Sequence, residues 1–373
     1  MLKQKQSRRQ FAGSLALGAL GTIGAGGRAL GAQGGQQTSA SRSGPAGSLI
    51  AVPGVSVGHW TDTRRATGCT AILFDQAAAA AADYSSSAPA ESMGVLLQPV
   101  SPVERIHAIF LTGGGMFGIA AAGGVVRFLE ERKVGFDWGT PDLRIPIVIS
   151  GAIDDLALGD PRIRPDADAA YKACASAAST PVVEGNVGAG AGATVGKMHR
   201  ARGYSGMKGG IGSASITLGD VVIGALAVVN AAGDVLDWRT GRIVAGARRK
   251  DGTLADSVEV MRGLVTGSAR GSVHDPALGS TTIVVVATNV DLSKTAMQKV
   301  ASMANCGGAR AIRPYHTTGD GDQLIAVSTR KLQRPNLQLT VIGALAADVV
   351  AEAIVRGVRA ARSVPEWPGL AAE

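Results

Sequence analysis

Two short stretches of the 373-residue chain carry side chains that could perform covalent chemistry. In HDPALGSTTIVVVATN (274–289), Ser280 and Thr281 stand where a loop meets the most hydrophobic expected strand. In RAIRPYHTTGDGD (310–322), Asp320 and Asp322 flank a glycine just before another apolar run. A hydroxyl is a weak nucleophile unless an adjacent base activates it. A threonine at a strand start and a pair of acids in a polar turn are also common structural features, so neither stretch decides the function alone.

A third stretch, GNVGAGAGATVGKM (185–198), looks like a phosphate-binding loop but fails its spacing. That loop needs a glycine five residues before the Gly-Lys pair and a hydroxyl directly after the lysine. Ala191 and Met198 occupy these two positions. We therefore expect no nucleotide site here. Lys197 is either a solvated lysine at the end of a glycine-rich bend or part of another site.

The elements that must position these residues alternate between strands and alanine-rich helices. We expect strands at 108–114, 145–152, 213–218, 220–230, 234–238, 281–289 and 323–329. We expect helices at 118–132, 167–178, 292–303 and 342–361. This order indicates an α/β or α+β class and does not give the topology.

The N-terminus has the features of an export signal. Its cationic head is followed by Ser7-Arg8-Arg9-Gln10-Phe11, which matches a twin-arginine signal. We expect cleavage near Ala32, a flexible linker over 33–48, and a single catalytic domain over 49–373. The segment 11–27 is too weakly apolar for a convincing membrane span, so we expect a periplasmic or secreted protein without stable membrane insertion. The alternative is a flexible, basic N-terminal segment that carries no targeting signal.

Charge and cysteine content exclude several classes of protein. The formal charge is +8, but five Lys or Arg and no acid lie in the first 32 residues. The remainder is nearly balanced, which does not favour nucleic-acid binding. Cys69, Cys174 and Cys306 are interpreted as small core residues, with one possible disulfide that cannot be assigned. Neither the cysteines nor the five histidines show metal-ligand spacing, so no metal or cofactor is expected.

Five blocks in order, across nearly the whole chain after the leader, resemble one family. They are FLTGGGMFGIAAAGGVVRFLEE, EGNVGAGAGATVGK, KGGIGSASITLGD, STTIVVVATN and RAIRPYHTTGDGD. They resemble the autoprocessing N-terminal-nucleophile aminopeptidases and amidases, which include L-aminopeptidase/D-esterases, β-peptidyl aminopeptidases and endo-type 6-aminohexanoate oligomer hydrolases. The resemblance implies an α+β fold, a four-layer αββα sandwich, and a homo-oligomer of α/β pairs.

The resemblance also implies that the chain cuts its own Ser280–Thr281 bond. Thr281 then begins a β fragment, residues 281–373, while the α fragment ends at residue 280. Its hydroxyl would attack the substrate carbonyl and its new α-amine would take the proton. An α-amine has a pKa near 8, which suits a general base near neutral pH.

By the same resemblance, Asp320 and Asp322 would orient the hydroxyl and amine of Thr281. The side-chain amide of Asn230 would stabilise the oxyanion of the transition state. Lys197 would be the lysine beside the nucleophile, where an ammonium lowers the pKa of the Thr281 amine. Lys208 is the competing candidate for that role, and His316 is expected to brace the Asp320 loop.

One position departs from the family pattern. Where some members carry a tyrosine beside the site, this chain has Asp154 in GAIDDL, which could bind a substrate ammonium or cap a turn. Gly114, Gly115, Met116 and Phe117 fall in the substrate-pocket region of the family. They could line a pocket or serve tight strand–helix packing, and both interpretations remain open.

These observations predict an exported, self-processed amidohydrolase or aminopeptidase with Thr281 as nucleophile. Its substrates would be small peptides or unusual amides of D-, β- or ω-amino acids. One alternative is acyl transfer to an amine, as in the ornithine acetyltransferases. Another is an inactive exported binding protein of the same fold, which would remain uncut.

Overall fold

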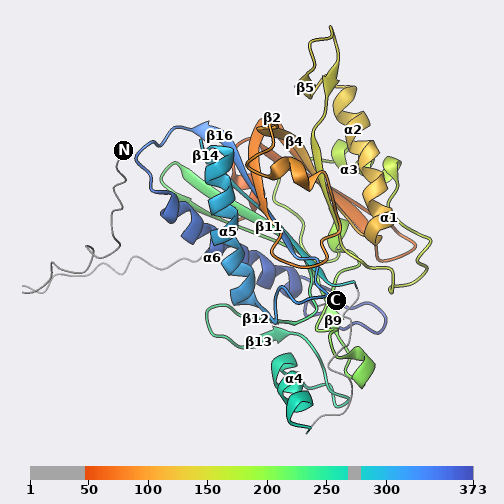
Figure 1. The fold of residues 1–373 in the computed structure, drawn as a ribbon. Coiled ribbons are helices and arrows are strands. Elements are labelled where there is room, and N and C mark those ends of the chain that lie inside the picture. Colours follow the sequence, from red (N-terminus) through yellow and green to blue (C-terminus); the bar gives the residue numbers. More distant parts are fainter. Residues whose placement is uncertain (1–46, 268–278, 373) are drawn as a thin grey trace, which may run out of the picture. The chain divides into compact units, whose positions relative to one another are not determined.

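The computed structural model describes residues 47–267 and 279–372, whose strands form one large mixed sheet with helices on its outer faces (Figure 1). The expected signal (1–32) and most of the linker (33–46) lie outside the described residues. The strand order is β10 (Gly210–Leu218), β11 (Val221–Asn230), β14 (Thr281–Val290), β16 (Gln323–Leu332), β2 (Gly68–Asp83), β4 (Arg105–Thr112), β7 (Val148–Ala152) and β3 (Glu91–Ser92). A ninth strand, β1 (Val55–Thr61), pairs with β2.

Two strand pairs are parallel, β14 with β16 and β4 with β7, and the others in this sheet are antiparallel. The helices are α1 (Gly115–Ile119), α2 (Gly123–Glu130), α3 (Ala167–Ala175), α4 (Ser257–Thr266), α5 (Lys294–Ala311) and α6 (Leu339–Arg359). Smaller sheets join β12 (Asp234–Leu236) to β13 (Ile243–Ala245) and β15 (Ile312–Arg313), β5 (Phe136–Asp137) to β6 (Arg144–Ile145), and β8 (Thr194–Val195) to β9 (Met207–Lys208).

The long strand β2 carries the sheet from one layer to another. Near its start, Ile72 faces an inner apolar cluster while Ala71 faces the cluster under α2 and α3. Past a register shift between Leu73 and Ala78, Ala80 still faces the inner cluster but Ala81 now faces the cluster under α5 and α6. The sheet therefore folds over on itself along β2.

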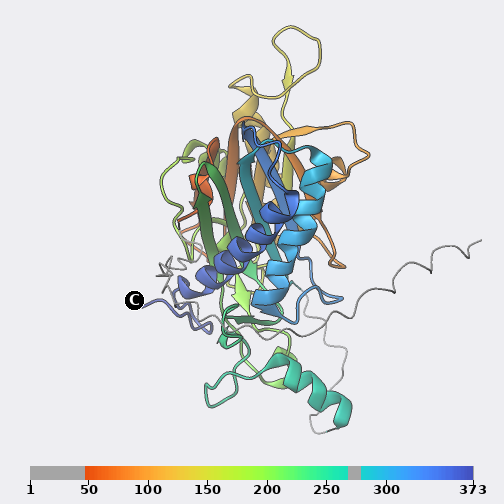
Figure 2. The same ribbon diagram turned by 90° about the vertical axis from the view of Figure 1, so that its left-hand side faces the viewer.

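Three stacked apolar clusters define four layers. Because strand side chains alternate between faces, Val284 and Val286 of β14 pack under α5 and α6, while Ile283 and Val285 face the inner cluster. The two helices lie side by side over this half of the sheet (Figure 2). On the other side, α2 and α3 pack over β2 and β4. This confirms the α+β class and the expected αββα arrangement.

Two expectations about local structure need correction. The helix expected at 118–132 is interrupted: α1 ends at Ile119, a 3-10 turn follows, and α2 begins at Gly123. A Cβ on Gly124 would lie 1.8 Å from the carbonyl oxygen of Ala167, so glycine allows α2 to pack closely on α3. The helix α4 was not anticipated.

Within residues 47–267 and 279–372, no helix is both long enough and apolar enough to cross a membrane.

Candidate active site

The Ser280–Thr281 bond lies at one end of the sandwich, where β11 ends and β14 begins. Asn230, the last residue of β11, is the direct register partner of Thr281. Leu226 and Val228 of β11 face the inner cluster, as do alternate residues of β14. By the two-residue period of strands, Asn230 and Thr281 therefore point to the same side, between the two sheet layers.

The nucleophile candidate is buried against the bond that it would cut. Thr281 is 4% exposed, and its Oγ1 donates to the carbonyl oxygen of Ser280 at 2.6 Å. The backbone N–H of Gly321 donates to the same oxygen at 2.9 Å. This second contact belongs to a short parallel bridge between Ser280 and Asp320, which joins the two stretches that the sequence singled out.

Asn230, the oxyanion candidate, and Lys197 both donate to the carbonyl of Gly279 rather than to that of Ser280. The Nδ2 of Asn230 donates to the carbonyl oxygen of Gly279 at 2.8 Å, and the Nζ of Lys197 donates to it at 2.9 Å. Lys197 also donates to the Oδ1 of Asn230 at 2.6 Å, so the two side chains hold one another. In the uncut chain this donor pair thus occupies the carbonyl one residue upstream of the Ser280–Thr281 bond.

Burial alters the proton affinity of Lys197. The partly buried ammonium loses hydration, and this desolvation lowers the pKa of Lys197 to about 7. The carboxylates of Asp154 and Asp320 oppose the effect by favouring the charged form. Burial thus weakens the hold of Lys197 on its proton relative to that of a solvated lysine.

The two acids differ in their surroundings. The Oδ1 of Asp322 accepts from the N–H of Thr282 at 2.6 Å, and its Oδ2 accepts from the N–H of His316 at 3.2 Å. Asp320 accepts from the N–H of Thr317 at 2.9 Å, and its Oδ1 has no hydrogen-bond partner among the described residues. Burial and the nearby Asp322 raise the pKa of Asp320 to about 6.

The structure therefore brings Thr281, Asn230, Lys197, Asp320 and Asp322 into one cluster. The hydroxyl of Thr281 is hydrogen-bonded to the Ser280 carbonyl in this uncut chain, and Asp322 contacts the neighbouring amide. The backbone N–H of His316 donates to Asp322, and the Nδ1 of its ring lies 3.5 Å from the Oδ2 of the same carboxylate. Residues 274–278 of the loop before Gly279 lie outside the described part of the chain.

The predicted pocket residues connect to this cluster through Asp154. A Cβ on Gly279 would lie 3.0 Å from the Cβ and Cγ of Asp154, and the main-chain carbonyl of Asp154 accepts from the Nδ2 of Asn230 at 3.2 Å. The Oδ1 of Asp154 also accepts from the N–H of Leu156 at 2.9 Å, so it caps a turn. A Cβ on Gly115 would lie 3.9 Å from Asp154.

The other three pocket candidates follow the end of β4. Gly114 takes φ +83°, and its N–H donates to Asp155 at 2.9 Å. Met116 is 66% exposed and Phe117 is 61% exposed, with the guanidinium of Arg164 4.0 Å from the centre of the Phe117 ring. These two side chains are thus accessible rather than packed between strand and helix.

Lys208, the competing lysine, has a structural role. Its fully buried Nζ donates to the carbonyl oxygens of Gly190, Ala193 and Gly209 at 3.1, 2.7 and 2.7 Å. Three acceptors use all three of its protons. Lys208 therefore fixes the glycine-rich stretch that leads to Lys197.

A buried ion pair that the sequence analysis missed supports the same region. Arg65 and Asp155 pair at 3.0 Å, with side chains 1% and 0% exposed. Asp155 also accepts from the Oγ1 of Thr67 at 2.7 Å. The sequence offered one sign of this pair, the adjacent acids Asp154 and Asp155 in GAIDDL. Neighbouring side chains in an extended segment point to opposite sides, so the pattern is compatible with burial of one of the two acids.

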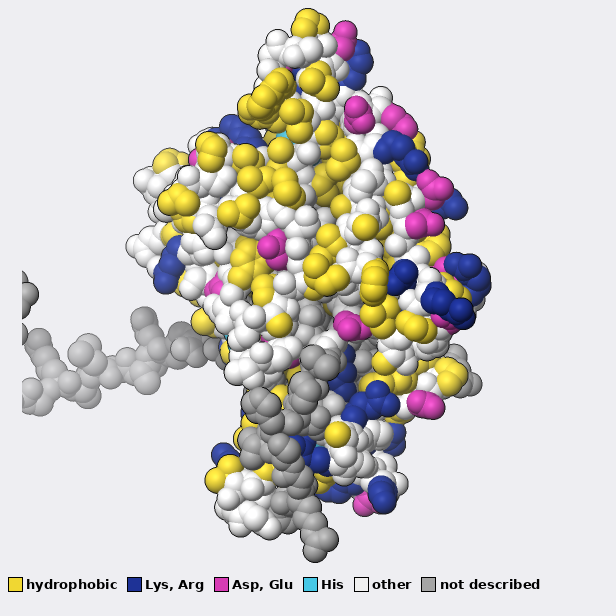
Figure 3. All heavy atoms as spheres, turned by 45° about the vertical axis from the view of Figure 1, so that its right-hand side comes forward, with side chains coloured by type: hydrophobic (Ala, Val, Ile, Leu, Met, Phe, Trp, Pro, Cys, Tyr) yellow, Lys and Arg dark blue, Asp and Glu magenta, His cyan; other side chains and the backbone are white. Residues whose placement is uncertain are grey.

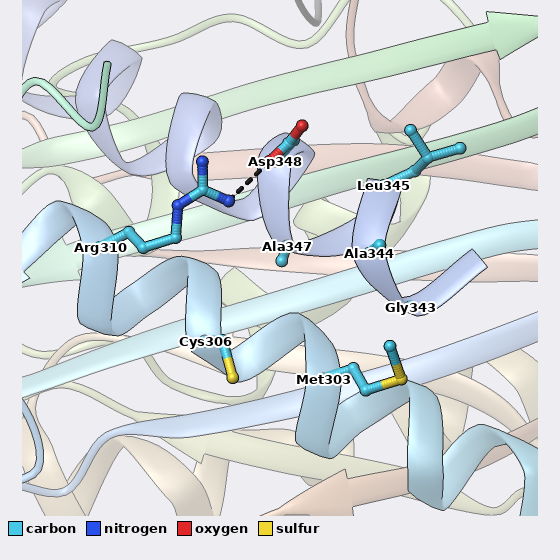
Figure 4. A pocket seen from close by; sticks show the side chains of 8 residues that line it. All are labelled: Met303, Cys306, Arg310, Gly343, Ala344, Leu345, Ala347 and Asp348. Carbon is cyan, nitrogen blue, oxygen red and sulfur yellow. Dashed lines mark hydrogen bonds and ion pairs between the residues drawn. The ribbon is translucent and has the colours of Figure 1, made fainter. Parts of the chain in front are cut away.

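Two concavities lie away from this cluster and contain none of the predicted catalytic residues. One, about 390 Å³, lies between α5 and α6, where Cys306 and Met303 of α5 lie opposite Ala347 and Gly343 of α6 (Figure 4). Cys306 is exposed, so its assignment to the core was wrong, whereas Cys69 and Cys174 are buried; all three are free thiols. The second, about 710 Å³, lies beside the hairpin β5–β6, which forms the top of the face with scattered apolar side chains shown in Figure 3.

Within the described ranges, no three His, Cys, Asp or Glu residues are grouped so that they could hold a metal ion.

Comparison with solved structures defines the fold class. An L-aminopeptidase D-Ala-esterase/amidase from Ochrobactrum anthropi, described as a variant of the Ntn hydrolase fold, matches with a TM-score of 0.61 and 23% identity over 85% of this chain and 87% of that one. A β-aminopeptidase of Burkholderia sp. matches with a TM-score of 0.62 and 21% identity over 88% and 92% of the two chains. The fold is therefore that of the Ntn (N-terminal-nucleophile) hydrolases.

Sequence comparison then gives the family. Residues 47–370 match peptidase family S58, and the chain belongs to that family of hydrolases. An uncharacterized aminopeptidase of Mycobacterium tuberculosis is 37% identical over 86% of this chain and 96% of its own length. A 6-aminohexanoate-oligomer endohydrolase of Kocuria sp. is 30% identical over 82% and 84% of the two chains.

Proposed function

We propose that this hydrolase cuts its own Ser280–Thr281 bond and then uses Thr281 as the N-terminal nucleophile of an amidohydrolase. The observation that carries the proposal is the position of the Thr281 hydroxyl, 2.6 Å from the carbonyl oxygen of the preceding residue and within a cluster of Asn230, Lys197 and two carboxylates. A hydroxyl in this place can attack the adjacent carbonyl carbon without a change in fold.

The cleavage follows from this geometry in two steps. The Oγ1 of Thr281 adds to the Ser280 carbonyl carbon, the C–N bond breaks, and the hydroxyl proton ends on the Thr281 nitrogen. Water then hydrolyses the resulting ester, which gives a Ser280 carboxylate, a free Thr281 hydroxyl and a free α-amine. The amine supplies the base that the hydroxyl lacked in the uncut chain.

Hydrolysis of a substrate amide uses the groups that cleavage exposes. The Thr281 hydroxyl attacks the substrate carbonyl while its amine accepts the proton. When Gly279 leaves, the Nδ2 of Asn230 and the Nζ of Lys197 become available to stabilise the developing oxyanion. Asp320 and Asp322 orient the amine and the loop around it.

The substrates that we propose are small peptides or unusual amides of D-, β- or ω-amino acids. Support comes from the names of the relatives, an aminopeptidase and a 6-aminohexanoate-oligomer endohydrolase. A carboxylate at Asp154 beside Gly279 favours substrates with a free ammonium group. We also propose export through the leader 1–32 and assembly as a homo-oligomer of α/β pairs.

The test compares wild-type protein with Thr281→Ala on a panel of such amides, with and without an amine acceptor. We expect hydrolysis by the wild type and none by Thr281→Ala, because the variant lacks both the hydroxyl and the cut that frees the amine. Hydrolysis by Thr281→Ala would contradict the nucleophile. Preferential transfer to the amine would identify an acyltransferase, and an inert wild type would identify a binding protein.

A further inference from the structure

The uncut chain presents its hydrogen-bond donors to two different carbonyls. Asn230 and Lys197 donate to the oxygen of Gly279, whereas the N–H of Gly321 donates to the oxygen of Ser280. Only the second oxygen belongs to the peptide bond that is cut. Within the described residues, the donors in hydrogen-bond contact with that oxygen are the Gly321 amide and the Thr281 hydroxyl.

We propose that the backbone N–H of Gly321 is the oxyanion donor of self-cleavage, separate from the Asn230–Lys197 pair that serves substrate hydrolysis. This inference rests on the proposed cleavage before Thr281. When Oγ1 adds to the Ser280 carbon, the carbonyl oxygen gains negative charge at a point 2.9 Å from the Gly321 nitrogen. A donor already aimed at that oxygen stabilises the charge without reorganisation.

The absence of a side chain at Gly321 has a second consequence for the nucleophile. A Cβ at this position would lie 2.6 Å from the Thr281 Oγ1 and 2.6 Å from the carbonyl oxygen of Ala88. Its φ is not in the left-handed region, so space rather than backbone conformation requires glycine here. The N–H of Gly321 therefore holds the Ser280 carbonyl oxygen by a hydrogen bond. The missing side chain leaves room for the Thr281 Oγ1 beside that carbonyl.

The register of the loop explains why the two donor sets do not coincide. Gly321 is held beside Ser280 by the bridge between Ser280 and Asp320 and by the N–H of Ala88, which donates to the Asp320 carbonyl at 2.9 Å. Asn230 is held at the end of β11 by the N–H of Thr194, which donates to its Oδ1 at 3.0 Å. The cleavage donor Gly321 thus lies just before β16 and the hydrolysis donor Asn230 at the end of β11, the two strands that flank β14.

The experiment follows cleavage and turnover separately in three variants made by cell-free synthesis. Uncut chain is measured over time by denaturing electrophoresis and intact mass, and turnover is measured on the cut material. We expect Gly321→Ala to cut at least about 100-fold more slowly than wild type, because the added Cβ would clash with the Thr281 Oγ1 and the Ala88 carbonyl, and relief of that clash moves the Gly321 N–H away from the Ser280 oxygen. Gly123→Ala is the matched control, since a Cβ there meets nothing within 4 Å, and it should cut at the wild-type rate.

Asn230→Ala is expected to behave in the opposite way, with normal cleavage and impaired turnover. This second variant keeps the proposal testable even if Gly321→Ala does not fold. It should cut within about threefold of the wild-type rate yet lose about 100-fold in kcat, because its amide contacts Gly279 rather than Ser280. The inference is overturned if Gly321→Ala cuts normally, or if folded Asn230→Ala stays uncut while the wild type cuts. A wild type that never cuts would instead contradict the proposed function itself.

Discussion

Asp320 and Asp322 place two carboxylates on either side of Gly321, and the protein stabilises them unequally. Asp322 accepts two backbone N–H groups, whereas Asp320 keeps one oxygen without a partner among the described residues. Burial and the neighbouring acid raise the pKa of Asp320 to about 6. Desolvation and the repulsion by Asp322 therefore cost folding free energy whenever Asp320 is ionised, which makes the acid pair a candidate for a role in chemistry.

The cost can be measured as a dependence of stability on pH. The pKa of Asp320 is higher in the folded than in the unfolded chain, so folding takes up protons between about pH 4 and 6, and stability falls as the pH rises through this window. In a Thr281→Ala background, which keeps the chain uncut, Asp320→Asn should add about 1–3 kcal/mol above pH 6 and little at pH 4. Chemical unfolding at several pH values checks this, and a difference independent of pH would contradict it.

At the residue scale, the candidate site residues could be named from the sequence, but their contacts could not. The resemblance named Lys197 ahead of Lys208, and the structure supports that order because Lys208 is satisfied by three carbonyls. Without that resemblance, the residues around the two lysines do not separate these roles, since both lysines lie next to glycines. The sequence assigned no role to Gly321, because the close approach of this residue to the Thr281 Oγ1 exists only in the folded chain.

At the scale of elements, the site is assembled from strand ends in both sheet layers. β11 and β14 supply Asn230 and Thr281, while the segments after β4 and β7 supply Gly114 and Asp154. Asp155 joins these two segments, because it accepts from the N–H of Gly114 at 2.9 Å and pairs with Arg65. Arg65 also donates to the carbonyls of Leu158 and Ile163 at 2.5 and 2.7 Å. Removing one partner leaves an uncompensated buried charge.

Asp155→Ala should therefore destabilise the protein by about 3–5 kcal/mol and lower turnover by displacing the Asp154 segment. The matched control is Asp160→Ala, which breaks the exposed pair with Arg162 and should change stability little. Thermal unfolding of both variants in the uncut background measures the difference. Equal effects of the two substitutions would show that the buried pair has no special role.

Several elements were predictable from the sequence because their pattern is local. The expected strands at 108–114, 220–230 and 281–289 and the long C-terminal helix were confirmed with small changes at their ends. β2 was not among the expected strands, since its second half runs through six alanines, which have low strand propensity. That segment is a strand because it pairs with β16 and is buried on both faces, and neither condition can be read locally.

At the scale of the whole molecule, the proposed cut falls directly before β14, a strand that is paired on both sides. β14 lies between β11 and β16, and the described part of the fragment after Ser280 also contributes α5 and α6 to the apolar cluster with β10 and β11. Breaking one peptide bond removes none of these contacts. The fragments should therefore co-elute in size-exclusion chromatography and separate only in denaturant; separation without denaturant would contradict this view of the core.

The most direct test of the account is the intact mass of the purified protein under denaturing conditions, with N-terminal sequencing of each species. We predict a fragment of 93 residues that begins Thr281-Thr282-Ile283, together with a second fragment that ends at Ser280. This result would fix the processing bond and the nucleophile together. A single uncut chain in protein that hydrolyses amides, or an internal cut within residues 49–373 at a bond other than Ser280–Thr281, would contradict this mechanism.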